Sequence, residues 1–163
     1  MKLNTISLSI MKTTLILLFI VLLNVLVMTA YRMDGNYMYP SVRDGDLCLL
    51  YKLDPYYLND VVLYKNPDGE RKVGRIVAVE DQEISFDGYG SYQINGYVVA
   101  EENMYDTNVS EESQIEFPLV VEEGEYFVLN DYRSDTSDSR EVGTISESQI
   151  EGKLFFLFRR REF

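Results

Sequence analysis

The stretch Gly35-Asn36-Tyr37-Met38-Tyr39-Pro40-Ser41-Val42-Arg43-Asp44-Gly45-Asp46 lies between a long apolar run and a segment rich in strand-forming residues. It contains two glycines and a proline, which occur where a backbone turns sharply or passes close to another group. Such a segment, held between an apolar run and a strand, is a candidate for the functional centre of the chain.

Two later blocks are also candidates for functional segments. The first is Lys72-Val73-Gly74-Arg75-Ile76-Val77-Ala78, a strand pattern with a glycine inside it. The second runs Asn130-Asp131-Tyr132-Arg133-Ser134-Asp135-Thr136-Ser137-Asp138-Ser139-Arg140-Glu141-Val142-Gly143.

In this order, the three blocks resemble those of the type I signal peptidases. The family patterns read Gly-x-Ser-Met-x-Pro-Thr-Leu-x-x-Gly-Asp, Tyr-Val-Lys-Arg-Val-Ile-Gly and Gly-Asp-Asn-Arg-x-x-Ser-x-Asp-Ser-Arg-x-x-Gly. The resemblance implies a Ser-Lys catalytic dyad, but Tyr37 stands at the position of the serine and Gly74 at that of the lysine. The chain therefore resembles a family member that has lost both catalytic residues.

The length and charge of the chain restrict its class. With 163 residues, it is long enough for one domain with a modest core. Residues 33–163 contain all 27 acidic residues and 12 of the 15 basic ones, so their net charge is −15. This charge argues against nucleic acid as a partner, because phosphate binding requires a basic surface.

The cysteine and histidine content excludes several kinds of site. Cys48 is the only cysteine, which rules out an intramolecular disulfide, and it lies in an apolar run that predicts core packing. The chain contains no histidine. Ser-His-Asp and Cys-His triads are therefore absent, and we expect no metal site and no cofactor.

The N-terminal residues predict a membrane anchor. A polar tail, residues 1–12, precedes an uncharged run that we assign to a transmembrane helix at residues 13–31. A cleavable signal peptide is the competing interpretation, but its apolar core is normally shorter. Lys2 and Lys12 before the run place the N-terminus in the cytoplasm and residues 33–163 on the outer face of the cell membrane.

The rest of the chain has the periodicity of strands. Branched and aromatic residues alternate with turn formers, and Asn95-Gly96 is a hairpin signal. We expect strands near residues 47–53, 61–64, 73–79, 84–86, 92–94, 97–99, 117–121, 126–130 and 154–158. No helical period of useful length appears, so the predicted fold class is mainly β, a signal peptidase-like ectodomain behind one transmembrane helix.

The resemblance also implies roles for other residues. In the family, the segment before the nucleophile forms one edge of a groove in which an extended substrate pairs through its main chain. The matching groove residues are Gly35, Tyr37, Met38, Tyr39 and Pro40. Asp138 and Arg140 match an ion pair that braces the site, and Thr136 matches a serine near the lysine.

The two replacements predict a folded site without catalysis. The phenol of Tyr37 is a poor nucleophile because its ordinary pKa is about 10, and Gly74 supplies no base. The ring of Tyr37 is predicted to fill the space that the lysine side chain would have occupied. A relocated dyad of Ser41 and Lys72 is the alternative, although Lys72 lies roughly 6 to 7 Å along the strand from the required position.

The resemblance implies two functions. In the first, the chain is a catalytically inactive homologue that binds an extended pilin segment in sortase-dependent pilus assembly, as similar inactive proteins of Gram-positive bacteria do, with a pilus sortase as neighbour. In the second, it is an atypical signal peptidase that cleaves exported preproteins. A regulator that competes with the active peptidase is a further hypothesis. The basic cluster Arg159-Arg160-Arg161 contacts either anionic lipid or solvent only.

Overall fold

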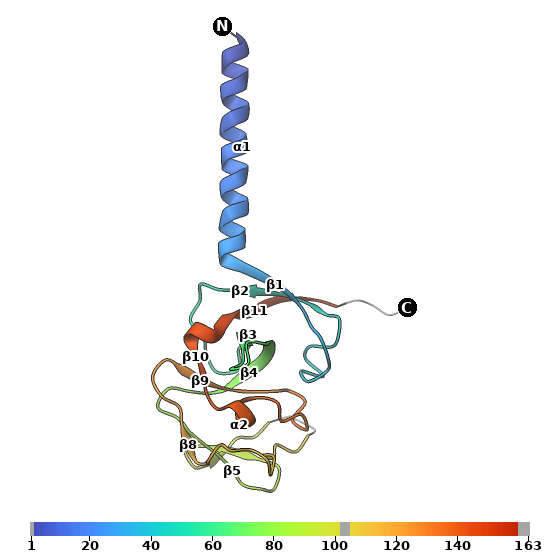
Figure 1. Cartoon of the computed structure of the whole chain (residues 1–163), viewed down its shortest axis with the longest axis vertical. Coiled ribbons are helices and arrows are strands. Elements are labelled where there is room, and N and C mark those ends of the chain that lie inside the picture. The colour runs from blue at the N-terminus through green and yellow to red at the C-terminus, as the bar shows by residue number, and fades with distance from the viewer. Residues whose placement is uncertain (1, 102–104, 160–163) are drawn as a thin grey trace.

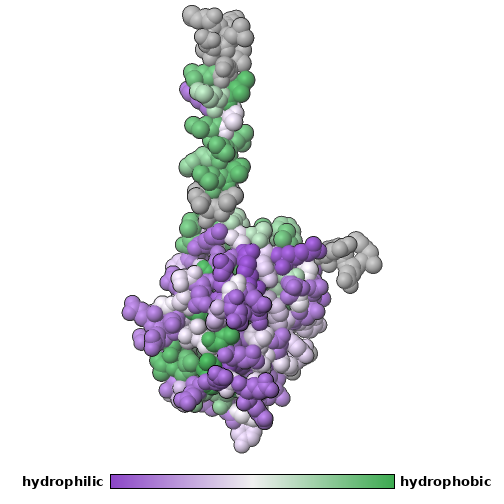
Figure 2. All heavy atoms as spheres, in the orientation of Figure 1, coloured by the Kyte–Doolittle hydropathy of each residue, from purple (hydrophilic) through white to green (hydrophobic). Residues whose placement is uncertain are grey.

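The computed structural model describes residues 2–101 and 105–159, with the side chains of residues 2–7 and 23–26 left out. A single long helix, α1 (Lys2–Val27), projects from a β domain that holds the rest of the described chain (Figure 1). Large apolar side chains between Leu8 and Leu22 are exposed along this helix (Figure 2). Within the described residues, no helix reaches the length and apolarity required to cross a membrane.

The chain passes directly from this helix into a strand, β1 (Met28–Arg32). The prediction of a helix through residue 31 is therefore wrong for its last four residues. They form an antiparallel ladder with β2 (Leu47–Tyr51), in which Tyr31 lies opposite Cys48. Strand pairing overrides the helical tendency of the apolar run at this point, because the ladder satisfies the backbone groups of both strands.

The larger of two sheets has seven strands in the order β1-β2-β11-β3-β4-β9-β10. Every recorded pair in it is antiparallel. The remaining members are β3 (Val61–Lys65), β4 (Arg71–Val79), β9 (Glu125–Leu129), β10 (Ile145–Ser146) and β11 (Ile150–Phe158). The prediction of a mainly β domain is confirmed.

The smaller sheet has four strands, in the order β7-β6-β5-β8. They are β5 (Glu83–Phe86), β6 (Tyr92–Ile94), β7 (Tyr97–Val98) and β8 (Leu119–Val120). The predicted hairpin at Asn95-Gly96 joins β6 to β7, and both turn residues have the positive φ that such a turn requires. Two short helices complete the described chain, α2 (Ser139–Val142) and the 3-10 helix η1 (Glu147–Gln149).

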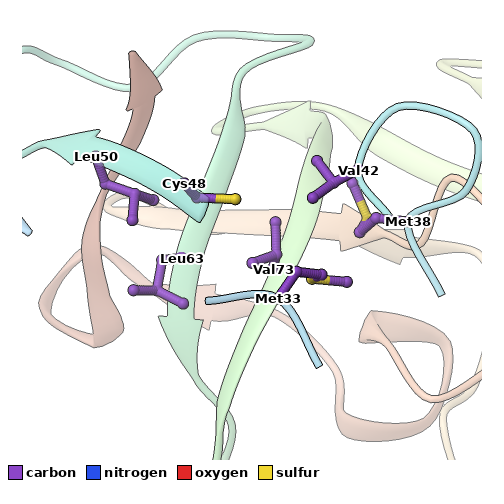
Figure 3. Packing of buried hydrophobic residues seen from close by; sticks show 7 residues of the cluster. All are labelled: Met33, Met38, Val42, Cys48, Leu50, Leu63 and Val73. Carbon is purple, nitrogen blue, oxygen red and sulfur yellow. The ribbon is translucent and has the colours of Figure 1, made fainter. Parts of the chain in front are cut away.

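The core consists of three apolar clusters. One of them includes Met33, Met38, Val42, Cys48 and Val73 and lies beneath the Tyr37 segment (Figure 3). A second cluster contains Tyr64, Ile76 and Val128, and a third contains residues of both sheets, including Ile84 and Phe127. Strand β4 contributes to all three clusters, with Val73 in the first, Ile76 in the second and Val77 in the third.

Candidate functional site

The Tyr37 segment is a loop between β1 and β2 whose two ends are tied together. Met33 donates its backbone N–H to the Asp46 carbonyl at 2.8 Å, and Gly45 donates to the Met33 carbonyl at 2.9 Å. Gly35 has φ +85° and donates its N–H to the Asp44 carboxylate. Because L side chains rarely adopt that φ, glycine is the residue this loop requires there.

Tyr37 uses its hydroxyl to hold a backbone group of β4. The phenolic oxygen accepts a hydrogen bond of 3.4 Å from the Val73 N–H, and the Lys72 ammonium lies 5.8 Å from the ring centroid. Burial raises the pKa of Tyr37 far above its usual range. The neutral phenol is therefore the stable form, and it is a poor nucleophile.

Gly74, at the predicted lysine position, is enclosed by two other side chains. A Cβ added there would lie 3.1 Å from Cε1 of Tyr64 and 3.3 Å from Cβ of Val128. Tyr64 is fully buried, and its hydroxyl has no hydrogen-bond partner among the described residues. The Tyr37 ring was predicted to fill the space of the lysine side chain. At the Cβ position of residue 74 this prediction is wrong, because the side chains that pack there are those of Tyr64 and Val128.

Ser41 and Lys72 have different partners. The Ser41 hydroxyl accepts a hydrogen bond of 3.2 Å from Arg75, whereas the Lys72 ammonium donates to the Ser137 carbonyl at 2.9 Å. Arg75 also forms a bidentate ion pair with Asp131, with both N···O distances 2.7 Å. In this arrangement neither member of the alternative dyad is paired with the other.

The predicted groove residues differ in exposure. Met38 is fully buried, and its sulfur accepts a hydrogen bond of 3.4 Å from the Asp131 N–H, so it supports the loop from below rather than facing a ligand. Pro40 is exposed. Tyr39 is 39% exposed, and the Arg43 guanidinium lies 5.2 Å from its ring centroid.

A pocket of about 340 Å³ opens beside this loop. Its walls include Tyr37 and Tyr39, and also residues that the sequence did not single out as lining a groove: Asn36, Tyr132 and Asp135. Asp135 accepts hydrogen bonds from both the N–H and the hydroxyl of Ser137, which fixes this wall. The segments that the sequence motifs identified therefore do meet, from two sides of one pocket.

The structure pairs Asp138 with Arg140 as the resemblance implied. The N···O distance is 2.7 Å, and neither side chain is exposed. Asp138 also accepts hydrogen bonds from the backbone N–H groups of Asn130 and Arg140 and caps α2. Burial raises the pKa of the Asp138 carboxyl, whereas the Arg140 charge and these hydrogen bonds act in the opposite direction.

Thr136 has a partner other than a lysine. Its hydroxyl donates a hydrogen bond to the Glu141 carboxylate. Sequence reasoning missed the buried Arg133, which forms an ion pair with Glu101 at 2.6 Å and donates to the Asn130 carbonyl. Among the described residues, no cluster of three or more acidic or cysteine side chains could hold a metal ion.

Comparison with known proteins finds relatives along most of the chain. Residues 7–159 match the family model described as signal peptidase, peptidase S26. Signal peptidase I V of Bacillus subtilis is 30% identical over 138 residues, covering 76% of this chain and 82% of that protein. Signal peptidase IB of Staphylococcus aureus (strain Mu50) is 26% identical, covering 81% and 78% of the two chains.

A solved structure shows the same relationship. The crystal structure of a signal peptidase I from Enterococcus faecalis V583 has a TM-score of 0.51 with this chain at 27% sequence identity. The match covers 63% of this chain and 98% of that one.

This chain belongs to the S26 signal peptidase family. That Tyr37 and Gly74 stand in place of the catalytic serine and lysine remains a prediction from the resemblance of the sequence motifs. The Asp138–Arg140 pair and the loop closed by Met33 and Gly45 are present in full. At the centre of the site in this signal peptidase family member lie Tyr37, Gly74 and the Tyr64 ring that packs beside Gly74.

Proposed function

We infer that this chain binds an extended segment of an exported protein beside Tyr37 and does not cleave it. The observation that carries the inference is the packing around Gly74, where a Cβ added to residue 74 would lie only 3.1 Å from the Tyr64 ring and 3.3 Å from the Cβ of Val128. A peptidase of this type requires a base whose amine reaches the nucleophile. The phenol of Tyr37, kept neutral by burial, supplies no nucleophile in its place.

A pilin subunit is the client we propose, with a pilus sortase acting nearby. This proposal rests on the resemblance to inactive signal peptidase homologues in which both dyad residues are replaced. A groove that pairs with a peptide backbone does not depend on the catalytic side chains, so binding can survive their loss.

Attachment to the outer face of the cell membrane through the N-terminal helix belongs to the same proposal. The support is the row of exposed apolar side chains on α1, which includes Leu15, Ile16, Leu18, Phe19 and Leu22. Fractionation of cells expressing the full chain tests it. Recovery in the membrane fraction is expected, and release by a salt wash would contradict it.

Peptidase activity is the second candidate, favoured by the names of the relatives, which are signal peptidases. The Lys72 ammonium lies 5.8 Å from the ring centroid of Tyr37, the residue at the nucleophile position. Activity through Ser41 would require both residues to leave their present partners, Arg75 and Ser137.

Cleavage of a preprotein by the full-length protein in detergent separates the two candidates. The controls are the Ser41→Ala/Lys72→Ala double variant and an active signal peptidase. We expect no cleavage by either form of this protein. Cleavage that disappears in the double variant would establish a rewired peptidase and overturn the binding proposal.

A matched pair of surface variants tests binding. Tyr39→Glu places a charge in the wall of the pocket, whereas Tyr97→Glu places one on the smaller sheet, where Tyr97 is 80% exposed. We expect pilin capture to fall with Tyr39→Glu and to persist with Tyr97→Glu. Equal capture by both variants would place the binding surface elsewhere.

A further inference from the structure

A second pocket, of about 590 Å³, lies where the end of β4 and the start of β9 meet the segment before β3 and the first residue of η1. It shares no lining residue with the pocket beside Tyr37. Its apolar and aromatic walls are formed by Tyr56, Tyr57, Leu58, Val79 and Tyr126. Its charged walls, for which we call it the glutamate pocket, are formed by Glu80, Glu123, Glu125 and Glu147. No described residue that lines it is basic.

Two tyrosine rings form an aromatic corner in the glutamate pocket. The ring centroids of Tyr56 and Tyr126 lie 5.8 Å apart, with an angle of 90° between the ring planes. Both residues are half-buried and pack against the core cluster that contains Ile76 and Val128. Because the face of an aromatic ring carries partial negative charge, this corner favours a cation over an anion.

The four carboxylates of the glutamate pocket are not neutralised by the described part of the chain. No ion pair within residues 2–101 and 105–159 involves any of them. Burial, followed by the charge of Glu147, raises the pKa of both Tyr56 and Tyr126 above its ordinary value. The pocket therefore combines two neutral rings with uncompensated negative charge.

Lys153 shows how this part of the domain holds an ammonium group. Its Nζ lies 5.4 Å from the ring centroid of Tyr57, and 3.5 and 3.6 Å from the carboxylates of Asp54 and Asp60. One tyrosine face and two carboxylates thus bind a lysine of the chain itself. The corner of Tyr56 and Tyr126 offers the same combination of groups inside the pocket, which Lys153 does not line.

The walls of the glutamate pocket are held in place by backbone contacts. Val79 lies opposite Tyr126 in the ladder between β4 and β9. Glu147 donates its backbone N–H to the Gly124 carbonyl at 2.9 Å, which fixes η1 against the turn before β9. A pocket formed in advance lowers the entropy cost of ordering its side chains around a ligand.

We propose that the glutamate pocket binds a lysine or arginine side chain of a partner protein. The carboxylates select a positive charge, and the alkyl stem of a basic side chain packs against the tyrosine rings. At the rim, Tyr57 and Leu58 are 60% and 43% exposed and can cover the apolar neighbours of the basic residue. The pocket volume lies in the range that holds a drug-sized ligand, which is more than an amino group requires. This interaction surface goes beyond the proposed function, because it does not depend on binding or cleavage at Tyr37.

Two blocked peptides test the requirement for charge. The probe is acetyl-Ala-Lys-Leu-amide, and its matched control replaces lysine by norleucine, which keeps the alkyl stem and lacks the amine. Calorimetric titration of the full-length protein in a non-ionic detergent measures both affinities. We expect the control to bind at least about tenfold more weakly, because it forms no charge-assisted hydrogen bond. Equal affinities, or no binding of the probe at millimolar concentration, would overturn the proposal.

Variants that keep the shape of the pocket test its residues. Glu80→Gln/Glu147→Gln should weaken binding of the probe by roughly two- to tenfold, since each exposed carboxylate contributes a modest attraction. Glu111→Gln/Glu112→Gln removes the same charge from an exposed loop outside the pocket and should leave the affinity unchanged. Equal weakening by the two double variants would assign the binding to the overall charge of the domain and overturn the proposal.

Backbone amide shifts of the unaltered full-length protein locate the bound probe. The amides of Val79 and Gly124, which line the glutamate pocket, should shift, whereas that of Asn36 in the pocket beside Tyr37 should not. Shifts at Asn36 alone would place the basic side chain elsewhere and contradict the proposal. Binding of n-butylamine as tight as that of the peptide would make a small amine the occupant and overturn the assignment to a protein. Pilin capture and preprotein cleavage are measured separately, so neither result decides the other.

Discussion

The carboxylate of Asp138 and the guanidinium of Arg140 form an ion pair of 2.7 Å that is completely buried. All five N–H donors of the guanidinium have acceptors: both carboxylate oxygens and the carbonyls of Asn108, Arg133 and Asp135. The pair thus ties α2 to the segment of Asn108 and to the loop that contains Arg133 and Asp135.

Asp138→Asn should lower the free energy of unfolding by about 3–5 kcal/mol, because it leaves the Arg140 charge buried without its counterion. Denaturant titration measures the loss. Glu151→Gln is the matched control, since Glu151 pairs with the more exposed Lys65 and Arg71 and should lose less than about 1 kcal/mol. Similar losses in the two variants would mean that burial does not control the strength of the Asp138–Arg140 pair.

Gly74→Ala should destabilise the protein, although alanine usually stabilises a strand relative to glycine. The added Cβ would meet Tyr64 and Val128 at 3.1 and 3.3 Å, and such overpacking costs about 1–3 kcal/mol. In a Tyr64→Leu background the same change should cost little, because the ring atom at 3.1 Å is gone. A double-mutant cycle by thermal or denaturant unfolding measures the coupling, and additive effects would show that Tyr64 does not limit the space at residue 74.

We expect the buried Cys48 thiol to make the free energy of unfolding fall at alkaline pH. Burial, with a smaller effect of the Asp46 charge, raises the pKa of Cys48 from 9.0 to about 11. The folded state then holds its proton more tightly than the unfolded state, so this contribution is complete below pH 9 and is lost as the pH rises through about 11. The difference between the unfolding free energies of the unaltered protein and Cys48→Val should change in this pH interval and stay constant below it; a constant difference throughout would contradict the shift.

Much of the fold could be predicted from the sequence because the strands of the domain are short alternating runs between turn formers. Tyr92–Ile94 matches its predicted bounds, and Val61–Lys65 differs by one residue. The misses have local causes. β1 follows directly on the apolar run of α1, and it was predicted as helix through residue 31 because its pairing with β2 cannot be read from the sequence. The four-residue helix α2 is too short to show a helical period, and its N-cap is Asp138.

The part of the site that lies within the three sequence motifs could be predicted. The motifs identified Tyr37, which lines the pocket of about 340 Å³, and the Asp138–Arg140 pair, whose guanidinium donates to the carbonyl of the pocket residue Asp135. Tyr64 escaped notice because its place beside Gly74 depends on the register of β3 against β4, in which Tyr64 lies opposite Lys72. A sequence pattern contains no information on that register. Likewise, the ion pair between Asp46 and Arg159 could not be predicted from their distant positions in the sequence. Arg159 was expected to contact lipid or solvent only, but it binds Asp46 of the domain.

Restoring the dyad should not by itself restore cleavage. In Tyr37→Ser/Gly74→Lys, the new lysine would begin against Tyr64 and Val128, so its amine cannot reach the serine without displacing them. We expect this double variant to cleave a preprotein only at the residual rate of Tyr37→Ser, which lacks a base, and to unfold more readily than the unaltered protein. Adding Tyr64→Ala opens the required space, and the triple variant should cleave about a hundredfold faster than the double variant, the order of magnitude that a positioned general base contributes. Unfolding curves of both variants show whether each is folded at the assay temperature, and equal cleavage by the two would mean that Tyr64 does not exclude the base.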